Sequence, residues 1–193
     1  MNEDKIIEMP SAEQLENEIS RIRHGREYIR ILRSTISSLI VVAAIAVLIS
    51  MLFLPVLRVT GTSMTPTLQN DELVICRKWG EFKRGDVIAF YYNNKILLKR
   101  VIGLSGDVID IAEDGTVYVN GEAIDEPYLN EKAFGECDLN LPYQVTDERV
   151  FVMGDHRSTS VDSRSTTVGC VANESVVGEV MLRIWPFKKI GTV

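Results

Sequence analysis

The sequence predicts a mainly-β protein in which a single N-terminal transmembrane helix is followed by an all-β extracytoplasmic domain. The helix is predicted by an uncharged apolar stretch at residues 34–57, whose 24 residues exceed the about 20 that a helix needs to cross a bilayer core. The β domain is predicted by short runs rich in β-branched and aromatic residues after position 58. Pairs of turn-forming residues separate several of these runs, as hairpins require.

The composition narrows the possible classes of function. The 193 residues suit one modest domain with an appendage, because domains commonly contain roughly 100–200 residues. The 27 acidic and 21 basic side chains give a net charge of −6, which argues against a nucleic-acid-binding protein. Three cysteines cannot form a complete disulfide framework, so a small disulfide-stapled fold is excluded as well.

Residues 1–33 are predicted to form a cytoplasmic, partly helical N-terminal arm. Ser11, followed three residues later by Gln14, resembles a capping box at the start of a helix. The sequence assigns no chemistry to this arm. Apolar residues recur on one face of the predicted helix, at Leu15, Ile19, Ile22 and Ile29.

Residues 34–57 are predicted to be a retained transmembrane helix. A cleaved signal peptide would have a shorter apolar core and a small-residue cleavage site, and a buried helix of a soluble protein would have a polar face. Five arginines lie between residues 19 and 33, whereas only Arg58 follows the stretch directly. The positive-inside rule therefore places the N-terminus in the cytoplasm and residues 58–193 on the outer face of the plasma membrane.

The segment 58–193 is predicted to be one β-rich domain. Asn93-Asn94, Asp114-Gly115 and Asn120-Gly121 occupy positions where hairpin turns are expected, because these residues tolerate positive φ. Residues 125–148 contain two prolines and many acids, and they are predicted to leave the sheet. The predicted strands are 72–77, 86–92, 95–102, 107–111, 116–119, 150–153 and 176–185.

Two of the segments in this domain carry residues suited to nucleophilic catalysis. The first contains Ser63, which needs a base within hydrogen-bond reach to act as a nucleophile. His24 lies on the predicted cytoplasmic side, so His156 is the only histidine that could serve as this base outside. A lysine is the other route, because desolvation lowers its pKa, and strand alternation places Lys99 between aliphatic residues on one face of its strand.

A further segment, 151–164, is an apolar strand that runs into a dense cluster of polar and charged residues. Carboxylate–guanidinium pairs would fix the loop that follows this strand. The two arginines would oppose a bound cation, so a metal site is disfavoured. The candidates for these pairs are Asp155, Arg157, Asp162 and Arg164.

Four segments resemble, in their order along the chain, the sequence boxes of the type I signal peptidases, which are membrane-bound serine proteases with a Ser–Lys dyad. The boxes read GTSMTPTL at 61–68, RGDVIAF at 84–90, LLKRVIGLSGDVI at 97–109 and MGDHRSTSVDSR at 153–164. The resemblance is specific because all four boxes occur in order. It implies a barrel-like β domain that removes N-terminal signal peptides from exported precursors through an acyl-enzyme.

The resemblance assigns roles to individual residues. It makes Ser63 the nucleophile, Lys99 the general base and Ser160 the residue whose hydroxyl orients the lysine amine. The backbone N–H of Ser63 would contribute to the oxyanion hole. The supporting residues that it implies are the ion pair of Asp162 and Arg164 and the structural residues Asp155 and Arg157.

Two positions depart from the family pattern. Some members carry a hydroxyl residue two positions before the nucleophile, where this chain has Gly61. The second oxyanion donor is therefore open between Thr60 and Thr62. His156 stands where the family often has asparagine, and we interpret it as a loop residue rather than a base.

The resemblance also implies how substrate is bound. The family binds its substrate as an added β-strand, with shallow pockets for small side chains. No metal and no organic cofactor are implied; signal-peptide-bearing precursors are the expected substrates. Membrane lipid and the export translocon are the other expected partners, and nucleic acid is not. The residues expected by position to line the pockets are Val59, Met64, Leu68, Ala89, Leu97 and Leu98.

Two alternatives remain. A sortase-like cysteine transpeptidase also combines an anchor with a β-barrel and would use Cys170, with His156 only 14 positions upstream. A catalytically inactive, membrane-tethered β-domain would act as a binding module, although both Ser63 and Lys99 are present. The sequence also leaves open whether Cys137 and Cys170 form a disulfide.

Overall fold

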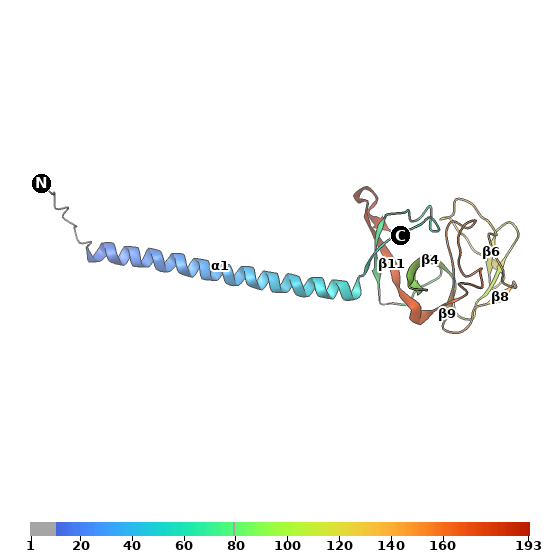
Figure 1. Ribbon diagram of the computed structural model, residues 1–193, viewed down its shortest axis with the longest axis horizontal. Helices are drawn as coiled ribbons and strands as arrows, with labels where there is room; N and C mark the ends of the chain where they lie inside the picture. Colours follow the sequence, from blue (N-terminus) through green and yellow to red (C-terminus); the bar gives the residue numbers. More distant parts are fainter. Residues whose placement is uncertain (1–10, 79) are drawn as a thin grey trace. The chain divides into compact units, whose positions relative to one another are not determined.

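The computed structural model describes residues 11–78 and 80–193. The first ten residues of the predicted N-terminal arm lie outside the described residues. The described part divides into a helical unit, which extends to Ile49, and a β unit from Ser50 to Val193 (Figure 1).

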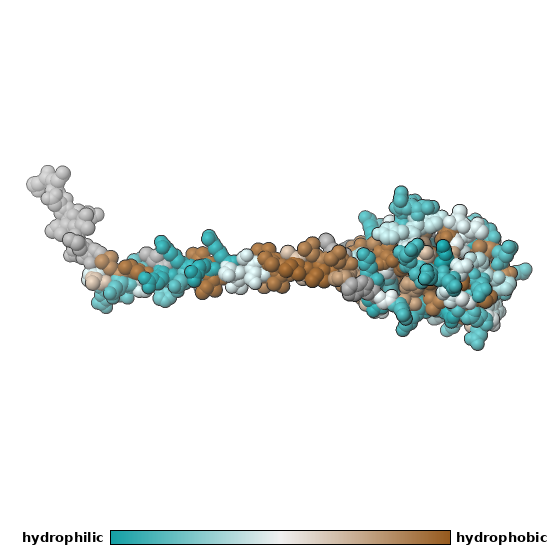
Figure 2. Space-filling model, turned by 90° about the horizontal axis from the view of Figure 1, so that it is seen from below, coloured by the Kyte–Doolittle hydropathy of each residue, from teal (hydrophilic) through white to brown (hydrophobic). Residues whose placement is uncertain are grey.

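Helix α1 (Ala12–Phe53) is continuous over 42 residues. Its start confirms the predicted capping box: the Ser11 N–H donates to Gln14 Oε1 at 2.9 Å, and the Gln14 N–H donates to Ser11 Oγ at 3.3 Å. The C-terminal part of the helix is covered by hydrophobic side chains, whereas its N-terminal part carries many hydrophilic ones (Figure 2). Within the described residues, α1 is the one helix long and apolar enough to cross a membrane.

The helix ends earlier than the hydropathy of the sequence predicts. α1 stops at Phe53, two residues before Pro55, and Val56–Arg58 already form strand β1. Proline lacks a backbone N–H and disfavours helical geometry at the residue before it, so the helix does not continue through this position. The predicted helix end at residue 57 is therefore wrong, although the apolar stretch is helical up to Phe53.

The β unit contains two antiparallel sheets. The larger sheet has the strand order β1 (Val56–Arg58), β2 (Leu73–Arg77), β11 (Val176–Trp185), β3 (Val87–Tyr92), β4 (Lys95–Gly103), β9 (Arg149–Met153) and β10 (Val171–Ala172), with β12 (Gly191–Thr192) paired to β11. The smaller sheet has the order β7 (Glu122–Ala123), β6 (Val117–Val119), β5 (Val108–Ile111) and β8 (Tyr143–Gln144). Two short 3₁₀ helices, Asn173–Ser175 and Phe187–Lys189, flank β11. Among the described residues, the larger sheet is an open path that ends at β1 and β10, so the expected closure into a barrel is not confirmed.

All seven predicted strands are present, each with bounds within one residue of the prediction. Two of the predicted turns have the positive φ that they require: Asn93 and Asn94 have φ of 43° and 59°, and Asn120 and Gly121 have φ of 55° and 83°. The segment 125–148 lies mostly outside the sheets, as expected, but Tyr143–Gln144 returns to pair with β5. The strands that the sequence did not predict are β1, β7, β8, β10 and β12, and each has only two or three residues.

The loop between β1 and β2 is anchored by apolar side chains. Val59, Met64 and Leu68 are each at most 3% exposed and pack in one hydrophobic cluster with residues of β2, β3 and β11. Burying such a side chain stabilises a fold by about 1.5–3 kcal/mol. The loop that carries Ser63 is therefore held against the larger sheet.

Candidate active site

Ser63 lies in the loop between β1 and β2, with its side chain half-buried. Two backbone hydrogen bonds close the loop at its base, from the Val59 N–H to the Glu72 carbonyl at 2.8 Å and from the Asp71 N–H to the Val59 carbonyl at 2.9 Å. The Ser63 carbonyl accepts the N–H of His156 at 3.0 Å. Within the described part of the chain, neither the Ser63 hydroxyl nor its N–H has a hydrogen-bond partner, so both groups are available to a substrate.

Lys99 lies on β4 and is 3% exposed. Its amine donates a hydrogen bond to Ser160 Oγ at 2.9 Å. Burial lowers the pKa of Lys99 from 10.5 to about 8; the carboxylates of Asp162 and Asp155 partly oppose this shift, whereas the guanidinium of Arg164 adds to it. The packing of the folded domain therefore desolvates the Lys99 amine.

Gly154 is the point where the Ser63 and Ser160 segments meet. A β-carbon on Gly154 would lie closer than 3.0 Å to both the hydroxyl oxygen of Ser160 and the carbonyl oxygen of Ser63. Only a glycine lets these two segments approach so closely. Since Ser160 also accepts the Lys99 hydrogen bond, the fold brings the three predicted catalytic residues into one neighbourhood from three separate segments.

We therefore expect Gly154→Ala to lower kcat on the order of 100-fold, because the added methyl group must displace Ser160 or the Ser63 loop and misplaced catalytic groups lose rate on this scale. The measurement is the cleavage rate, at saturation, of a synthetic peptide of the kind that the family resemblance implies as substrate. Gly191→Ala is the matched control, because a β-carbon there meets nothing within 4 Å and the backbone is unstrained. Equal rates for the two variants would contradict the steric role of Gly154.

Asp162 and Arg164 form the predicted ion pair. Arg164 Nη2 lies 2.9 Å from Asp162 Oδ2, and both side chains are fully buried. Burial acts to raise the pKa of Asp162, but the hydrogen bond and charge of Arg164, together with the N–H of Gly154, hold it below its usual value. The pair therefore fixes the loop that contains Gly154 and Ser160, since Asp162 Oδ2 also accepts the Gly154 N–H at 2.9 Å.

The other two charged residues of this loop find partners elsewhere in the chain. Asp155 accepts hydrogen bonds from Arg100 at 2.8 and 2.6 Å, and both side chains are buried. Arg157 is paired with Glu126, with one bond of 3.1 Å between Nη1 and Oε2, and both side chains are fully buried. The sequence did not identify Arg100 and Glu126 as partners, because they come from β4 and from the segment outside the sheets.

Tyr128 links these two ion pairs. Its ring lies against the Arg100 guanidinium, with 3.8 Å between Cζ and the ring centroid. Its hydroxyl donates to Glu126 Oε1 at 2.8 Å. Burial, followed by the charge of Glu126, raises the pKa of Tyr128. A connected set of buried charged groups therefore stabilises the loop that carries Ser160.

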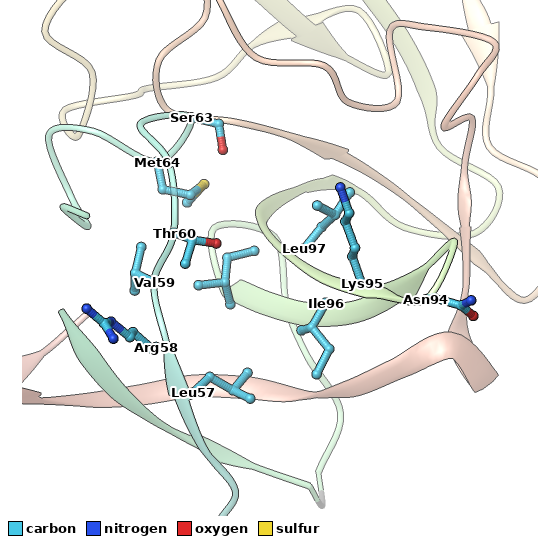
Figure 3. Close-up of a pocket in the computed structure, with 12 residues that line it drawn as sticks. Leu57, Arg58, Val59, Thr60, Ser63, Met64, Asn94, Lys95, Ile96 and Leu97 are labelled. Atoms are coloured by element: carbon cyan, nitrogen blue, oxygen red, sulfur yellow. The ribbon is translucent and has the colours of Figure 1, made fainter. Parts of the chain in front are cut away.

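A cavity of about 470 Å³ opens beside Ser63, between the chain at 57–64 and the start of β4 (Figure 3). Four of the six predicted pocket residues line it: Val59, Met64, Leu97 and Leu98. Leu68 and Ala89 do not, because both are completely buried in the cluster beneath the serine loop. The lining residues that the sequence did not identify are Leu57, Arg58, Thr60, Asn94, Lys95 and Ile96; their nearness to Ser63 and Lys99 in sequence was the available signal.

Residues of two free strand edges line this cavity. β4 pairs with β3 from Lys95 onward, whereas its pairing with β9 begins only at Arg100. β1 is the end strand of the larger sheet and pairs with β2. Within residues 11–78 and 80–193, no strand covers the second edge of β1 or of the first half of β4. An extended peptide can add to such an edge through its backbone hydrogen bonds.

Cys170 does not fit a nucleophilic role. Cys170 is 7% exposed, and burial raises the pKa of its thiol. A buried, protonated thiol is a poor nucleophile, so the cysteine transpeptidase alternative is not supported. All three cysteines are free, and Cys137 and Cys170 are accordingly unpaired in this structure.

Comparisons with known proteins show which family the sequence resembles. The family profile described as "Signal peptidase, peptidase S26" matches residues 32–185. Signal peptidase I of Bacillus licheniformis is 37% identical over 169 residues, which cover 80% of this chain and 89% of the relative. Signal peptidase I of Bacillus caldolyticus is 41% identical over 147 residues, which cover 68% of this chain and 79% of the relative. A crystal structure of a signal peptidase I from Enterococcus faecalis aligns with a TM-score of 0.45 and 30% identity, over 52% of this chain and 97% of that chain.

Proposed function

The chain belongs to the signal peptidase family, peptidase S26, and on this basis we propose that Ser63 and Lys99 form the Ser–Lys dyad with which it removes signal peptides from secreted precursors. The observation that carries the assignment is the buried Lys99 amine, hydrogen-bonded to Ser160 Oγ at 2.9 Å. With a pKa of about 8, roughly a tenth of Lys99 is neutral at pH 7, against less than about 0.1% of an ordinary lysine. The presence of this activated amine also argues against an inactive binding module.

The reaction is acyl transfer. Ser63 Oγ attacks the scissile carbonyl carbon while the lone pair of Lys99 Nζ takes the hydroxyl proton. The resulting tetrahedral intermediate breaks its C–N bond, and Lys99 returns the proton to the departing amine of the mature protein. Water, deprotonated by the same amine, then hydrolyses the ester between Ser63 and the signal peptide. Ser160 supports both steps, because the hydrogen bond that it accepts from Lys99 Nζ orients the single lone pair of the neutral amine.

The oxyanion hole uses the backbone N–H of Ser63, which has no acceptor among the described residues. Of the two candidates for the second donor, we favour Thr60, because it lines the cavity and Thr62 does not. The Thr60 hydroxyl points into the open space beside Ser63 (Figure 3). Gly61 has no side chain to contribute, and its N–H donates to Asn70 Oδ1 at 2.9 Å.

Substrate binds as an added strand between the free edges of β1 and β4. Backbone pairing provides the affinity, and the apolar lining residues Val59, Met64, Leu97 and Leu98 provide the selectivity. The apolar part of α1 crosses the plasma membrane with the arginine-rich segment in the cytoplasm and the β unit on the outer face. Membrane lipid surrounds the helix, and the export translocon delivers the precursor.

The pH dependence of cleavage tests the base. Only the neutral amine accepts a proton, so kcat/KM should increase with pH. The midpoint of this increase should lie near the pKa of Lys99, about 8, and kcat/KM should be low well below that pH. The measurement is kcat/KM of the detergent-solubilised full chain on a synthetic signal-peptide substrate between pH 6 and 9.5. Lys188→Ala, which removes an exposed lysine outside the cavity, should leave the profile unchanged. A flat profile between pH 6 and 9 would show that Lys99 is not the base.

A further inference from the structure

The cavity beside Ser63 has a cationic lining although the chain as a whole is acidic. Its twelve lining residues include Arg58 and Lys95 and contain no carboxylate, whereas the net charge of the chain is −6. Arg58 is already compensated, because its Nε and Nη2 donate to Asp71 Oδ1 at 3.0 and 2.8 Å. Lys95 is exposed, and among the described residues its amine has neither an ion pair nor a hydrogen bond. Lys95 is thus the uncompensated charge of the cavity.

The position of Lys95 on β4 gives this charge a defined place along the binding groove. Lys95 is the first residue of β4, opposite Tyr92 of β3, and strand alternation places it on the same face as Leu97 and Lys99. Its side chain extends into the space of the cavity beside Leu97 (Figure 3). Lys95 and Lys99 are four positions apart, which corresponds to about 13 Å along an extended strand.

We propose that Lys95 is a specificity-determining residue that favours substrates with a carboxylate side chain at one position. This position is four residues along the bound strand from the substrate residue that lies opposite Lys99. This inference rests on the proposed function, in which the substrate adds to the free edge of β4. A substrate strand keeps the same rise and alternation as β4, so the fourth residue along lies on the face of Lys95. Glutamate or aspartate there pairs with the free ammonium group, and lysine or arginine is repelled by it.

The size of the preference follows from the exposure of the lysine. An ion pair at an exposed site is screened by water and salt, and we expect about a two- to fivefold advantage in kcat/KM for glutamate over glutamine. Repulsion adds a similar factor against lysine, so the ratio between glutamate and lysine substrates should reach roughly tenfold. Raising the ionic strength should reduce this ratio, because the Debye length falls to about 3 Å at 1 M salt.

A position scan tests the proposal. Synthetic signal-peptide substrates carry Glu, Gln or Lys at one position at a time, from six residues before to six residues after the scissile bond. Wild type, Lys95→Gln and Lys95→Glu are compared as detergent-solubilised full chains. The expected result is a preference for Glu at one position, which lies three to five residues from the scissile residue. Lys95→Gln should remove this preference, and Lys95→Glu should invert it. The rate on the Gln peptide of the same position, measured for each variant, is the reference to which the Glu and Lys rates are compared, so a general change in activity does not affect the preference.

Lys83→Glu is the matched control. Lys83 is exposed, does not line the cavity, and its replacement changes the net charge by the same amount as Lys95→Glu. An inversion with Lys83→Glu as large as that with Lys95→Glu would attribute the preference to net charge and overturn the proposal. The absence of any position whose preference depends on residue 95 would overturn it as well. Failure of the wild type to cleave the Gln peptides would instead refute the proposed function, on which the inference rests.

Discussion

Replacement of Ser63 or of Lys99 by alanine should each lower the cleavage rate of a signal-peptide substrate on the order of 10⁴-fold or more. Losses of this size follow when one member of a catalytic unit is removed, because the remaining members cannot act alone. Ser63→Ala removes the atom that forms the acyl-enzyme, and Lys99→Ala removes the amine that deprotonates it. The measurement is the single-turnover cleavage rate of a synthetic substrate by the detergent-solubilised full chain.

Cys170→Ala is the control for this experiment. Its thiol is buried and protonated at neutral pH, so its removal should leave cleavage within about twofold of wild type as long as the fold persists. Circular dichroism of each variant checks the fold. Near-normal rates for Lys99→Ala would refute the base assignment, and loss of activity in folded Cys170→Ala would restore the cysteine transpeptidase alternative.

Replacement of Arg157 by methionine should lower the free energy of unfolding by about 3–5 kcal/mol. Arg157 and Glu126 are both fully buried, so removing the guanidinium leaves the Glu126 carboxylate uncompensated in a low-dielectric environment. The Gly154 carbonyl also loses a donor, the Arg157 Nε at 3.1 Å, so activity should fall together with stability. Guanidinium-induced unfolding of the detergent-solubilised chain, followed by tryptophan fluorescence, measures the loss.

Arg77→Met provides the comparison for Arg157→Met. Arg77 pairs with Glu179 at a surface where the two side chains are 45% and 23% exposed, and we expect its replacement to cost no more than about 1 kcal/mol. A second comparison adds Glu126→Leu to Arg157→Met, which should recover part of the stability because it removes the unpaired carboxylate. If Arg157→Met were as mild as Arg77→Met, the buried pair would not support the loop.

The β3–β4 hairpin shows why much of the fold was predictable. Its strands alternate or run apolar over six to nine residues, and Asn93 and Asn94 supply the positive φ of the turn. Both signals are local, so the sequence contains them completely. β8 (Tyr143–Gln144) is the opposite case, because two residues carry no periodicity and form a strand only through their pairing with β5. At the end of α1, the local effect of Pro55 on the backbone outweighs the hydropathy of the sequence, so the helix stops at Phe53.

Some features of the candidate active site were likewise predictable from local sequence, and others were not. Ser63, Lys99 and Ser160 were predicted from motifs, and the Asp162–Arg164 pair joins neighbours in sequence. The partners of Asp155 and Arg157 could not be read from the sequence, because Arg100 and Glu126 are 55 and 31 residues away. The expected pocket residues Leu68 and Ala89 belong to the core instead, since nearness to the nucleophile in sequence does not decide which way a side chain faces.

The sequence by itself determined the apolar helix and the seven longer strands, and it predicted the nucleophile and the lysine, because each depends on residues that are close together in the chain. Only the tertiary structure decided that the lysine amine loses its water, that Gly154 lets the Ser63 and Ser160 segments meet, and that a groove between two free edges remains open. The physical reason is that desolvation and ion pairing depend on which distant segments pack against a group. Local periodicity does not encode that packing.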